Sequence, residues 1–156
     1  MKTGAVALDE KDIQILKVLQ ADARLSIREV AARVNLSPSP TQERIRRLER
    51  EQVILQYGAL LDPKKVNKGI IVLCQVTIRE HNKRAAQEFI DRIQAFPEVT
   101  ECYNIAGDYD FLLKIVAASM ESFHVFFVNQ LSEVPFIGQI RSTFVMDVIK
   151  DTHILL

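Results

Sequence analysis

Residues 26–50 of the chain read SIREVAARVNLSPSPTQERIRRLER. Ser26 and Glu29 have the spacing of a capping box, in which two side chains satisfy backbone N–H groups at the start of a helix. This helix is predicted to end at Asn35, because asparagine tolerates the left-handed conformation that a tight exit requires. The stretch therefore predicts two short helices that are joined by a tight turn.

The second of these helices is predicted over residues 37–50. Ser37-Pro38 and Ser39-Pro40 both have the form of a cap followed by a first-turn proline, which is tolerated there because early N–H groups lack partners within the helix. Either serine could be the N-cap, and the pattern does not choose between them. Thr41, Ile45 and Leu48 recur at helical spacing and are predicted to face the core.

A helix that a tight turn holds away from its domain fits the major groove of DNA, with polar side chains towards base edges and arginines towards guanine or phosphate. The alternative is a three-helix protein-interaction domain whose arginines are solvated. On the DNA-binding interpretation, the predicted contact residues are Ser37, Ser39, Thr41, Gln42, Arg44, Arg46, Arg47 and Arg50.

The net charge of the whole chain does not support this interpretation, but the distribution of charge along the chain does. Twenty basic and twenty acidic residues cancel in total. Residues 24–50 nevertheless hold seven arginines and three glutamates, a net charge of +4. A basic patch confined to one segment is typical of a nucleic-acid face attached to a neutral partner domain.

The rest of the first domain, placed at residues 1–60, completes a three-helix unit. Asp9 is a candidate N-cap for a first helix that ends near Asp22. Residues 53–57 (VILQY) have the composition of a strand and are expected to form a small wing.

Beyond a linker at 61–69, residues 70–156 have a different pattern, with short β-branched runs alternating with amphipathic stretches. The expected order is βαββαβ, which predicts an α+β ferredoxin-like sandwich with both helices on one face of the sheet. Its elements are expected at 70–78, 83–95, 99–105, 110–117, 119–131 and 140–149.

Two of these strands are apolar on both faces. Residues 70–74 (IIVLC) and 111–113 (FLL) do not alternate as a strand with one solvated face should. We expect a second copy of the chain to cover the open face of the sheet. A dimer would also supply two reading helices for two half-sites on DNA.

Other classes of function have little support in the residues. Cys74 and Cys102 fall in strand-like runs and are expected to be buried thiols rather than a disulfide framework. The three histidines have no metal-ligand spacing, and no nucleophile–base pair is evident, so we predict no catalytic residue, metal or cofactor. Two alternatives stay open: a nonspecific architectural DNA-binding protein and, with Asp108 and Asp110 as its close carboxylates, a small enzyme.

No apolar run is long enough to cross a bilayer. Residues 1–7 do not resemble a signal peptide. We therefore expect a cytoplasmic protein with no membrane partner.

The motifs Leu8-Asp9, Asp12, Ile15-Leu16, Leu36-Ser37-Pro38-Ser39-Pro40, ERIRRLE at 43–49 and Gly107-Asp108-Tyr109-Asp110 resemble those of the leucine-responsive/asparagine-regulator (Lrp/AsnC) family. The resemblance runs from about Leu8 to Ile149, and by this resemblance the helix-turn-helix proper covers residues 27–46. It implies a winged helix-turn-helix joined to an amino-acid-sensing α+β domain, which dimerises through its sheets and often assembles into octamers. Asn35 is a departure, because many members carry glycine there.

By the same resemblance, the effector binds between dimers near the turn at 107–110. Backbone N–H groups around Gly107 can donate to a carboxylate, and Asp108 or Asp110 could hold an ammonium group. An open alternative is that Gly107-Asp108 only connects two strands, with a turn-stabilising aspartate. The expected effector-binding residues are Asn104, Ala106, Gly107, Asp108, Tyr109, Asp110 and Thr143.

Overall fold

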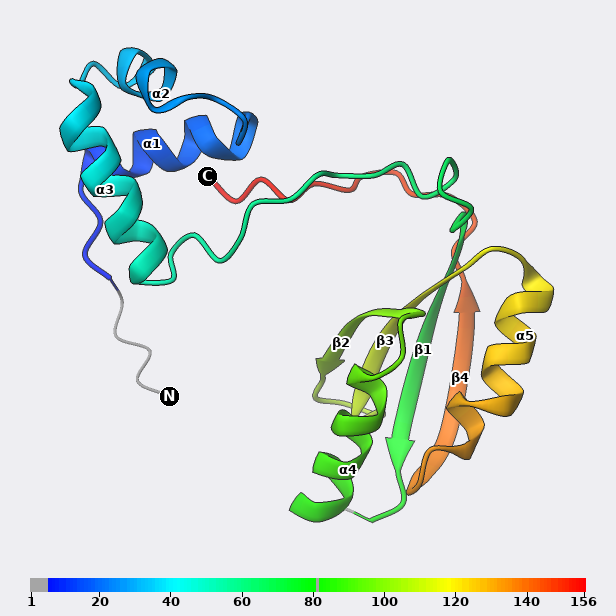
Figure 1. Cartoon of the computed structure of the whole chain (residues 1–156). Coiled ribbons are helices and arrows are strands. Elements are labelled where there is room, and N and C mark those ends of the chain that lie inside the picture. Colours follow the sequence, from blue (N-terminus) through cyan, green and yellow to red (C-terminus); the bar gives the residue numbers. More distant parts are fainter. Residues whose placement is uncertain (1–5, 81) are drawn as a thin grey trace. The chain divides into compact units, whose positions relative to one another are not determined.

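The computed structural model describes residues 6–80 and 82–156. Its contacts divide the chain into two compact units (Figure 1): the first runs to Leu60 and takes in Lys150–Leu156, and the second is Leu61–Ile149. We expected 70–156 to form one domain, whereas 150–156 group with the first unit. His81 and the first five residues, which belong to the stretch considered for a signal peptide, lie outside the described residues.

The first unit contains three helices, α1 (Glu10–Ala21), α2 (Ile27–Arg33) and α3 (Pro38–Arg50). The predicted caps are confirmed: Asp9 and Asp12 form a capping box on α1, and Ser26 and Glu29 form one on α2. Each box pairs N–H groups that the first turn of a helix leaves without partners. The helices enclose a small apolar core of Ile15, Leu16, Val30, Val34, Ile45 and Leu48.

The turn between α2 and α3 has the backbone conformation that was expected of Asn35, with a φ of 53°. The next N–H, that of Leu36, donates to the carbonyl oxygen of Ala31 at 3.0 Å. This bond closes the end of α2 and turns the chain sharply into α3. Ser37 is the N-cap of α3, but its side chain makes no capping hydrogen bond.

The strand expected at residues 53–57 is absent: this segment has no strand pairing in the described chain. The N–H groups of Val53 and Ile54 instead both donate to the carbonyl oxygen of Leu48, at 2.9 and 3.1 Å. These bonds satisfy the C-terminal end of α3 and hold the segment against it. The prediction of a wing from these residues was wrong because β propensity needs a partner strand before it forms a sheet.

The C-terminal segment of the first unit lies beside α1. Gln20 Nε2 donates to the carbonyl oxygen of His153 at 3.2 Å, and the Leu156 N–H donates to Gln20 Oε1 at 3.2 Å. One side chain of α1 therefore bonds to this segment at two residues, His153 and Leu156.

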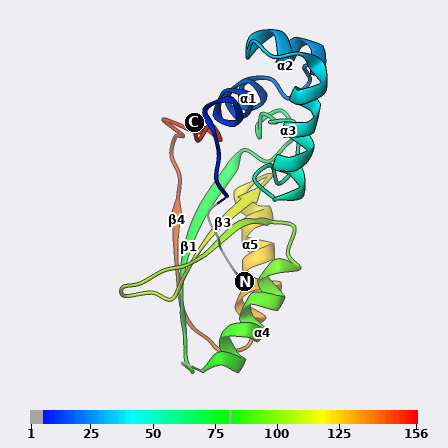
Figure 2. The ribbon, with the colours of Figure 1, turned by 90° about the vertical axis from the view of Figure 1, so that its left-hand side faces the viewer.

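The second unit is a four-stranded antiparallel sheet with the order β2-β3-β1-β4. The strands are β1 (Ile70–Ile78), β2 (Val99–Asn104), β3 (Phe111–Ala117) and β4 (Ile137–Phe144). Helices α4 (Lys83–Gln94) and α5 (Met120–Asn129) lie on one side of the sheet (Figure 2), and a short 3-10 helix, η1 (Leu131–Glu133), follows α5. This arrangement is the ferredoxin-like sandwich that the sequence predicts.

The core of this unit lies between the sheet and its helices. Alternate residues of β1 and β3 are buried there, with Val72 and Leu113 among those that have no exposed surface. Phe89 of α4 stacks on Phe111 with 4.6 Å between ring centroids. Cys74 is buried as expected, but Cys102 is exposed, because it lies on the edge strand β2.

Strand β4 lies earlier than the 140–149 that we expected. It pairs with β1 from Ile137, opposite Ile78, to Phe144, opposite Val72. The last contact is the Val145 N–H, which donates to the carbonyl oxygen of Ile71 at 3.0 Å. Because β1 begins at Ile70, the apolar residues after Val145 have no strand to pair with.

Asp110 fixes the connection between β2 and β3. Its Oδ2 accepts the N–H of Ile78 at 2.7 Å, and its own N–H donates to the carbonyl oxygen of Val76 at 2.9 Å. Its carbonyl oxygen accepts the Ile105 N–H at 2.9 Å and the Asn104 side chain at 3.2 Å. This supports a turn-stabilising role for the Asp110 carboxylate.

We expect Asn35→Ala to lower the free energy of unfolding by about 1 kcal/mol, because a Cβ-bearing residue without a polar side chain is disfavoured in the left-handed region. Asn35→Gly should stay within about 0.5 kcal/mol of the wild type. Urea denaturation measures both. Equal losses in the two variants would contradict a backbone origin of the effect.

Asp110→Ala should lower the free energy of unfolding by about 1–3 kcal/mol, because it leaves the Ile78 N–H without its acceptor. Asp108→Ala is the matched control: Asp108 is exposed on the same connection, and its loss should change stability by less than about 0.5 kcal/mol. Thermal or urea unfolding separates the two. If both variants were equally stable, Asp110 would not hold the turn.

Candidate nucleic-acid interface and ligand site

Helix α3 has one buried and one exposed side. Thr41, Ile45 and Leu48 are buried and fasten the helix to the unit. Four of the polar residues exposed on the opposite side follow one another at spacings close to whole helical turns and make an outward row: Ser39, Gln42, Arg46 and Arg50. Ser37 is also exposed at the start of the helix. These five were all predicted as contact residues; four of them share one side of α3, and Ser37 lies at the start of the helix.

Thr41 does not belong to this surface, and the prediction that it contacts DNA is wrong. Its side chain has no exposed area. The hydroxyl donates to the carbonyl oxygen of Ser37 at 3.0 Å, within the first turn of the helix. A β-branched threonine can bond in this way to the carbonyl one turn before it. Thr41 therefore stabilises the start of α3 from the inside.

Arg44 and Arg47 leave α3 on its flank towards α1, where two aspartates hold them. Arg44 Nη1 lies 2.8 Å from Asp12 Oδ1 and 2.6 Å from Asp9 Oδ2. Arg47 Nη2 pairs with the other oxygen of Asp12. Asp12 has no exposed surface, so both of its oxygens are paired where water does not reach them.

The pKa values of Arg44 and Asp9 are both shifted in this cluster. The pKa of Arg44 is raised, first by the hydrogen bond to Asp9 and then by the bond to Asp12. The pKa of Asp9 is lowered, first by the hydrogen bond from the Asp12 N–H and then by Arg44. Arg44 and Asp9 therefore keep their charges over the ordinary pH range.

Sequence reasoning missed this cluster. Asp9 was interpreted only as a cap and Asp12 only as part of a motif. The available signal was the spacing: two acids at the start of one helix and two arginines three residues apart on another. That signal is weak until the packing of the two helices is known, because each pair is separated by more than 30 positions in the chain.

The expected effector-binding residues are brought together only in part. Asn104, Ala106, Gly107, Asp108, Tyr109 and Asp110 lie on the connection between β2 and β3. Thr143 lies on β4 and pairs with Leu73 of β1. The connection adjoins Phe111, which pairs with Val76, three residues further along β1. That offset is about 10 Å along the sheet, so Thr143 is separate from the turn within one chain.

The backbone around Gly107 has the features expected of a site for a carboxylate. Gly107 has a φ of 137°, a conformation that L side chains rarely adopt, and nothing lies within 4 Å of a Cβ placed there. Among the described residues, the N–H groups from Ala106 to Tyr109 donate to no protein acceptor. Of the two aspartates, Asp110 is committed to the Ile78 N–H, whereas Asp108 is exposed.

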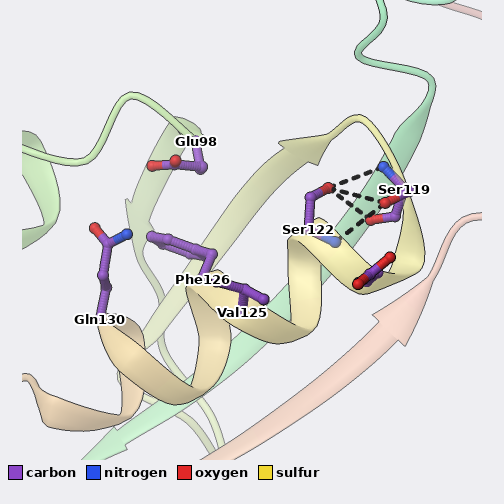
Figure 3. A pocket seen from close by; sticks show the side chains of 7 residues that line it. Glu98, Ser119, Ser122, Val125, Phe126 and Gln130 are labelled. Carbon is purple, nitrogen blue, oxygen red and sulfur yellow. Dashed lines mark hydrogen bonds between the residues drawn. The ribbon is translucent and has the colours of Figure 1, made fainter.

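A surface pocket lies elsewhere in the second unit. It has a volume of about 450 Å³ and lies along α5 (Figure 3). Its lining includes Glu98, Val125, Phe126 and Gln130, and the capping pair Ser119 and Ser122 is at one end. None of the expected effector-binding residues lines it.

Two further properties bear on the class of protein. No group of three histidines, cysteines or acids among the described residues could hold a metal ion. No helix in residues 6–80 and 82–156 is both long and apolar enough to cross a membrane.

Comparison with known families matches nearly the whole chain. Residues 8–54 match the winged helix-turn-helix DNA-binding family, and residues 71–155 match the Lrp/AsnC ligand binding domain. The first match lies within the first unit, and the second covers most of the second unit and runs on into the segment 150–156 of the first.

Similar proteins with assigned roles are regulators of transcription. The leucine-responsive regulatory protein of Haemophilus influenzae is 36% identical over 149 residues, which are 96% of this chain and 90% of the relative. The transcriptional regulator AzlB of Bacillus subtilis is 33% identical over 147 residues, 94% of each chain.

Solved structures show the same likeness. A transcriptional regulator from Neisseria meningitidis, in complex with L-Met, has a TM-score of 0.89 and 37% identity over 94% of this chain and 95% of its own. An AsnC family regulator from Agrobacterium tumefaciens has a TM-score of 0.90 and 34% identity over 96% of this chain and 97% of its own.

The matched families and relatives are regulators and not enzymes, which removes the enzyme alternative that Asp108 and Asp110 had left open. With a DNA-binding helix-turn-helix in the first unit and a ligand-binding sheet domain in the second, the chain belongs to the Lrp/AsnC family of transcriptional regulators.

Proposed function

We propose that the outward row of α3 (Ser39, Gln42, Arg46 and Arg50), with Ser37 at the start of the helix, reads DNA in the major groove. The observation that carries this proposal is the division of α3 into a buried side and an exposed polar side. The buried side anchors the helix, so the outward row is presented in a fixed orientation. A major groove admits one α-helix presented in this way.

The residues of the row have different tasks in this proposal. Gln42 and Arg46 can make bidentate hydrogen bonds to adenine and guanine, which distinguish one base pair from another. Ser37 and Ser39, near the N-terminus of α3, can donate to phosphate or to base edges, and Arg50 can neutralise a phosphate. Arg44 and Arg47 position the helix through Asp9 and Asp12, a different task from the contact that the sequence predicts for them.

We propose that the DNA-binding form is a dimer. The face of the sheet opposite α4 and α5 carries apolar side chains that the helices of the same chain leave partly exposed: Ile71, Leu73, Leu112 and Val116. A second copy that packs its own sheet face there would bury them and supply a second α3 for a second half-site. Further assembly into octamers stays a prediction from the family resemblance.

We propose that an amino acid binds at the β2–β3 connection and modulates DNA binding or assembly. The L-Met that the Neisseria relative binds supports an amino acid as the ligand. The N–H groups at Ala106–Tyr109 could donate to its carboxylate, and the exposed Asp108 could hold its ammonium group. A second copy would have to close the pocket, because the connection is exposed in one chain. Such a regulator has to share a compartment with the DNA that it binds, which agrees with the expected cytoplasmic location.

Arg46→Ala tests the reading face. On a duplex that the wild-type protein selects from a random-sequence pool, we expect binding to weaken by about 1–3 kcal/mol, because a base contact is lost. Binding to a random duplex of the same length should change less. Gel shift with competitor DNA measures both.

Arg24→Ala is the control for that test, because the side chain of Arg24 is 93% exposed and lies outside α3. An equal loss on both duplexes would assign Arg46 to phosphate, and an unchanged affinity would remove the outward row from DNA recognition. A wild-type protein that selects no sequence would favour the architectural alternative.

Gly107→Trp tests the effector site. We expect it to abolish the thermal stabilisation by whichever of the twenty amino acids stabilises the wild type, because a side chain at a φ of 137° distorts the backbone and fills the site. Any coupling to DNA binding, about 1–3 kcal/mol in the wild type, should vanish with it. Sedimentation should still find dimers. Gly58→Trp, at another open glycine, is the control; a retained response in Gly107→Trp would place the ligand elsewhere.

A further inference from the structure

The four arginines of α3 fall into two pairs. Arg46 and Arg50 are exposed. The side chains of Arg44 and Arg47 are only 29% and 34% exposed, and both end on Asp12. Half of the positive charge of the helix is thus bound within the protein, although all four residues satisfy the same sequence pattern.

Asp12 binds the side chains of both Arg44 and Arg47. It has no exposed surface, and its Oδ1 accepts from Arg44. Its Oδ2 accepts from Arg47 and from the Asp9 N–H. If Arg47 or Arg44 moved to a DNA phosphate, it would leave a buried carboxylate partly uncompensated, which is strongly unfavourable. Arg44 and Arg47 are therefore expected to stay paired with Asp12 when the protein binds DNA.

This matters because phosphate contacts do not depend on sequence. Each neutralised phosphate strengthens binding to every duplex and steepens the dependence of affinity on salt by about 0.9 in a plot of log K against log salt. On a selected sequence, base contacts fix the position of α3. On random DNA the protein is free to settle wherever its arginines reach most phosphates, so additional free arginines favour random DNA more.

We propose that Asp12 is a specificity-determining residue of this regulator: by holding Arg44 and Arg47, it limits binding to random DNA and so raises the preference for the target sequence. The inference rests on the proposed reading face of α3. Asp12 acts only through the two arginines and is a positioning residue, which itself makes no contact with DNA.

The test is Asp12→Asn in the full chain, which removes the charge and keeps the shape. Binding to a random duplex and to a duplex selected by the wild type is measured at several salt concentrations. We expect the random-duplex affinity to rise, its salt slope to steepen by about 0.9–1.8 for one or two additional phosphate contacts, and the ratio of the two affinities to fall. Lower affinity on both duplexes with an unchanged slope would overturn the proposal, since a merely structural role predicts that result.

Glu10→Gln is the matched control. It removes one negative charge from the same helix, but the described contact of Glu10 is to Gln14 and not to an arginine. Its slope should equal that of the wild type. In the background of Asp12→Asn, Arg44→Gln together with Arg47→Gln should restore the wild-type slope, because the freed charges are then gone. A slope that stays steep would overturn the proposal.

Single arginine variants keep the test decisive if Asp12→Asn does not fold. With Asp12 in place, Arg46→Gln should reduce the salt slope or the preference for the selected duplex, whereas Arg44→Gln removes no phosphate contact and should leave the salt slope unchanged. An Arg44→Gln variant that folds, as judged by circular dichroism, and loses about 0.9 in slope would overturn this inference alone. An Arg46→Gln variant with wild-type binding would instead overturn the proposed reading face.

Discussion

The ion pairs between Asp12 of α1 and the two arginines of α3 determine how the first unit presents its outer surface. A carboxylate without exposed surface has to be matched, and here Arg44 and Arg47 match it from a helix more than 30 residues away. The apolar contacts of Ile45 and Leu48 bring α3 to the core. These contacts bury one side of the helix but are nondirectional. The paired charges add directional bonds on the flank of α3 and so help to fix the direction of the outward row.

Local signals in the sequence predicted most of the fold. The capping residues Ser26 and Asp9 and the left-handed Asn35 each act within a few positions, so a short stretch contains all that determines them. The sheet topology also followed, because the order of elements leaves few ways to pair them. The predictions that failed concern strands, because the extent of a strand depends on a partner strand. Residues 53–57 have no partner strand, and β4 ends where β1 ends.

The candidate sites divide in the same way. Exposure along α3 follows from helical periodicity, and all four residues of the outward row were among the predicted contacts. Periodicity also predicted that Thr41 faces the core, which contradicts its place among those contacts. The engagement of Arg44 and Arg47 depends on packing, which periodicity alone does not give. At the β2–β3 connection, the glycine conformation could be anticipated from residue type, whereas the commitment of Asp110 to Ile78 of another strand could not.

The segment Lys150–Leu156 makes the first unit discontinuous along the chain. During synthesis, α1, α2 and α3 leave the ribosome before the sheet domain, but the stretch that bonds to Gln20 leaves after it. The DNA-binding unit therefore acquires its last contacts only when the ligand-binding unit has been made. A fragment cut at Leu60 would contain every helix of the first unit and still lack one part of it.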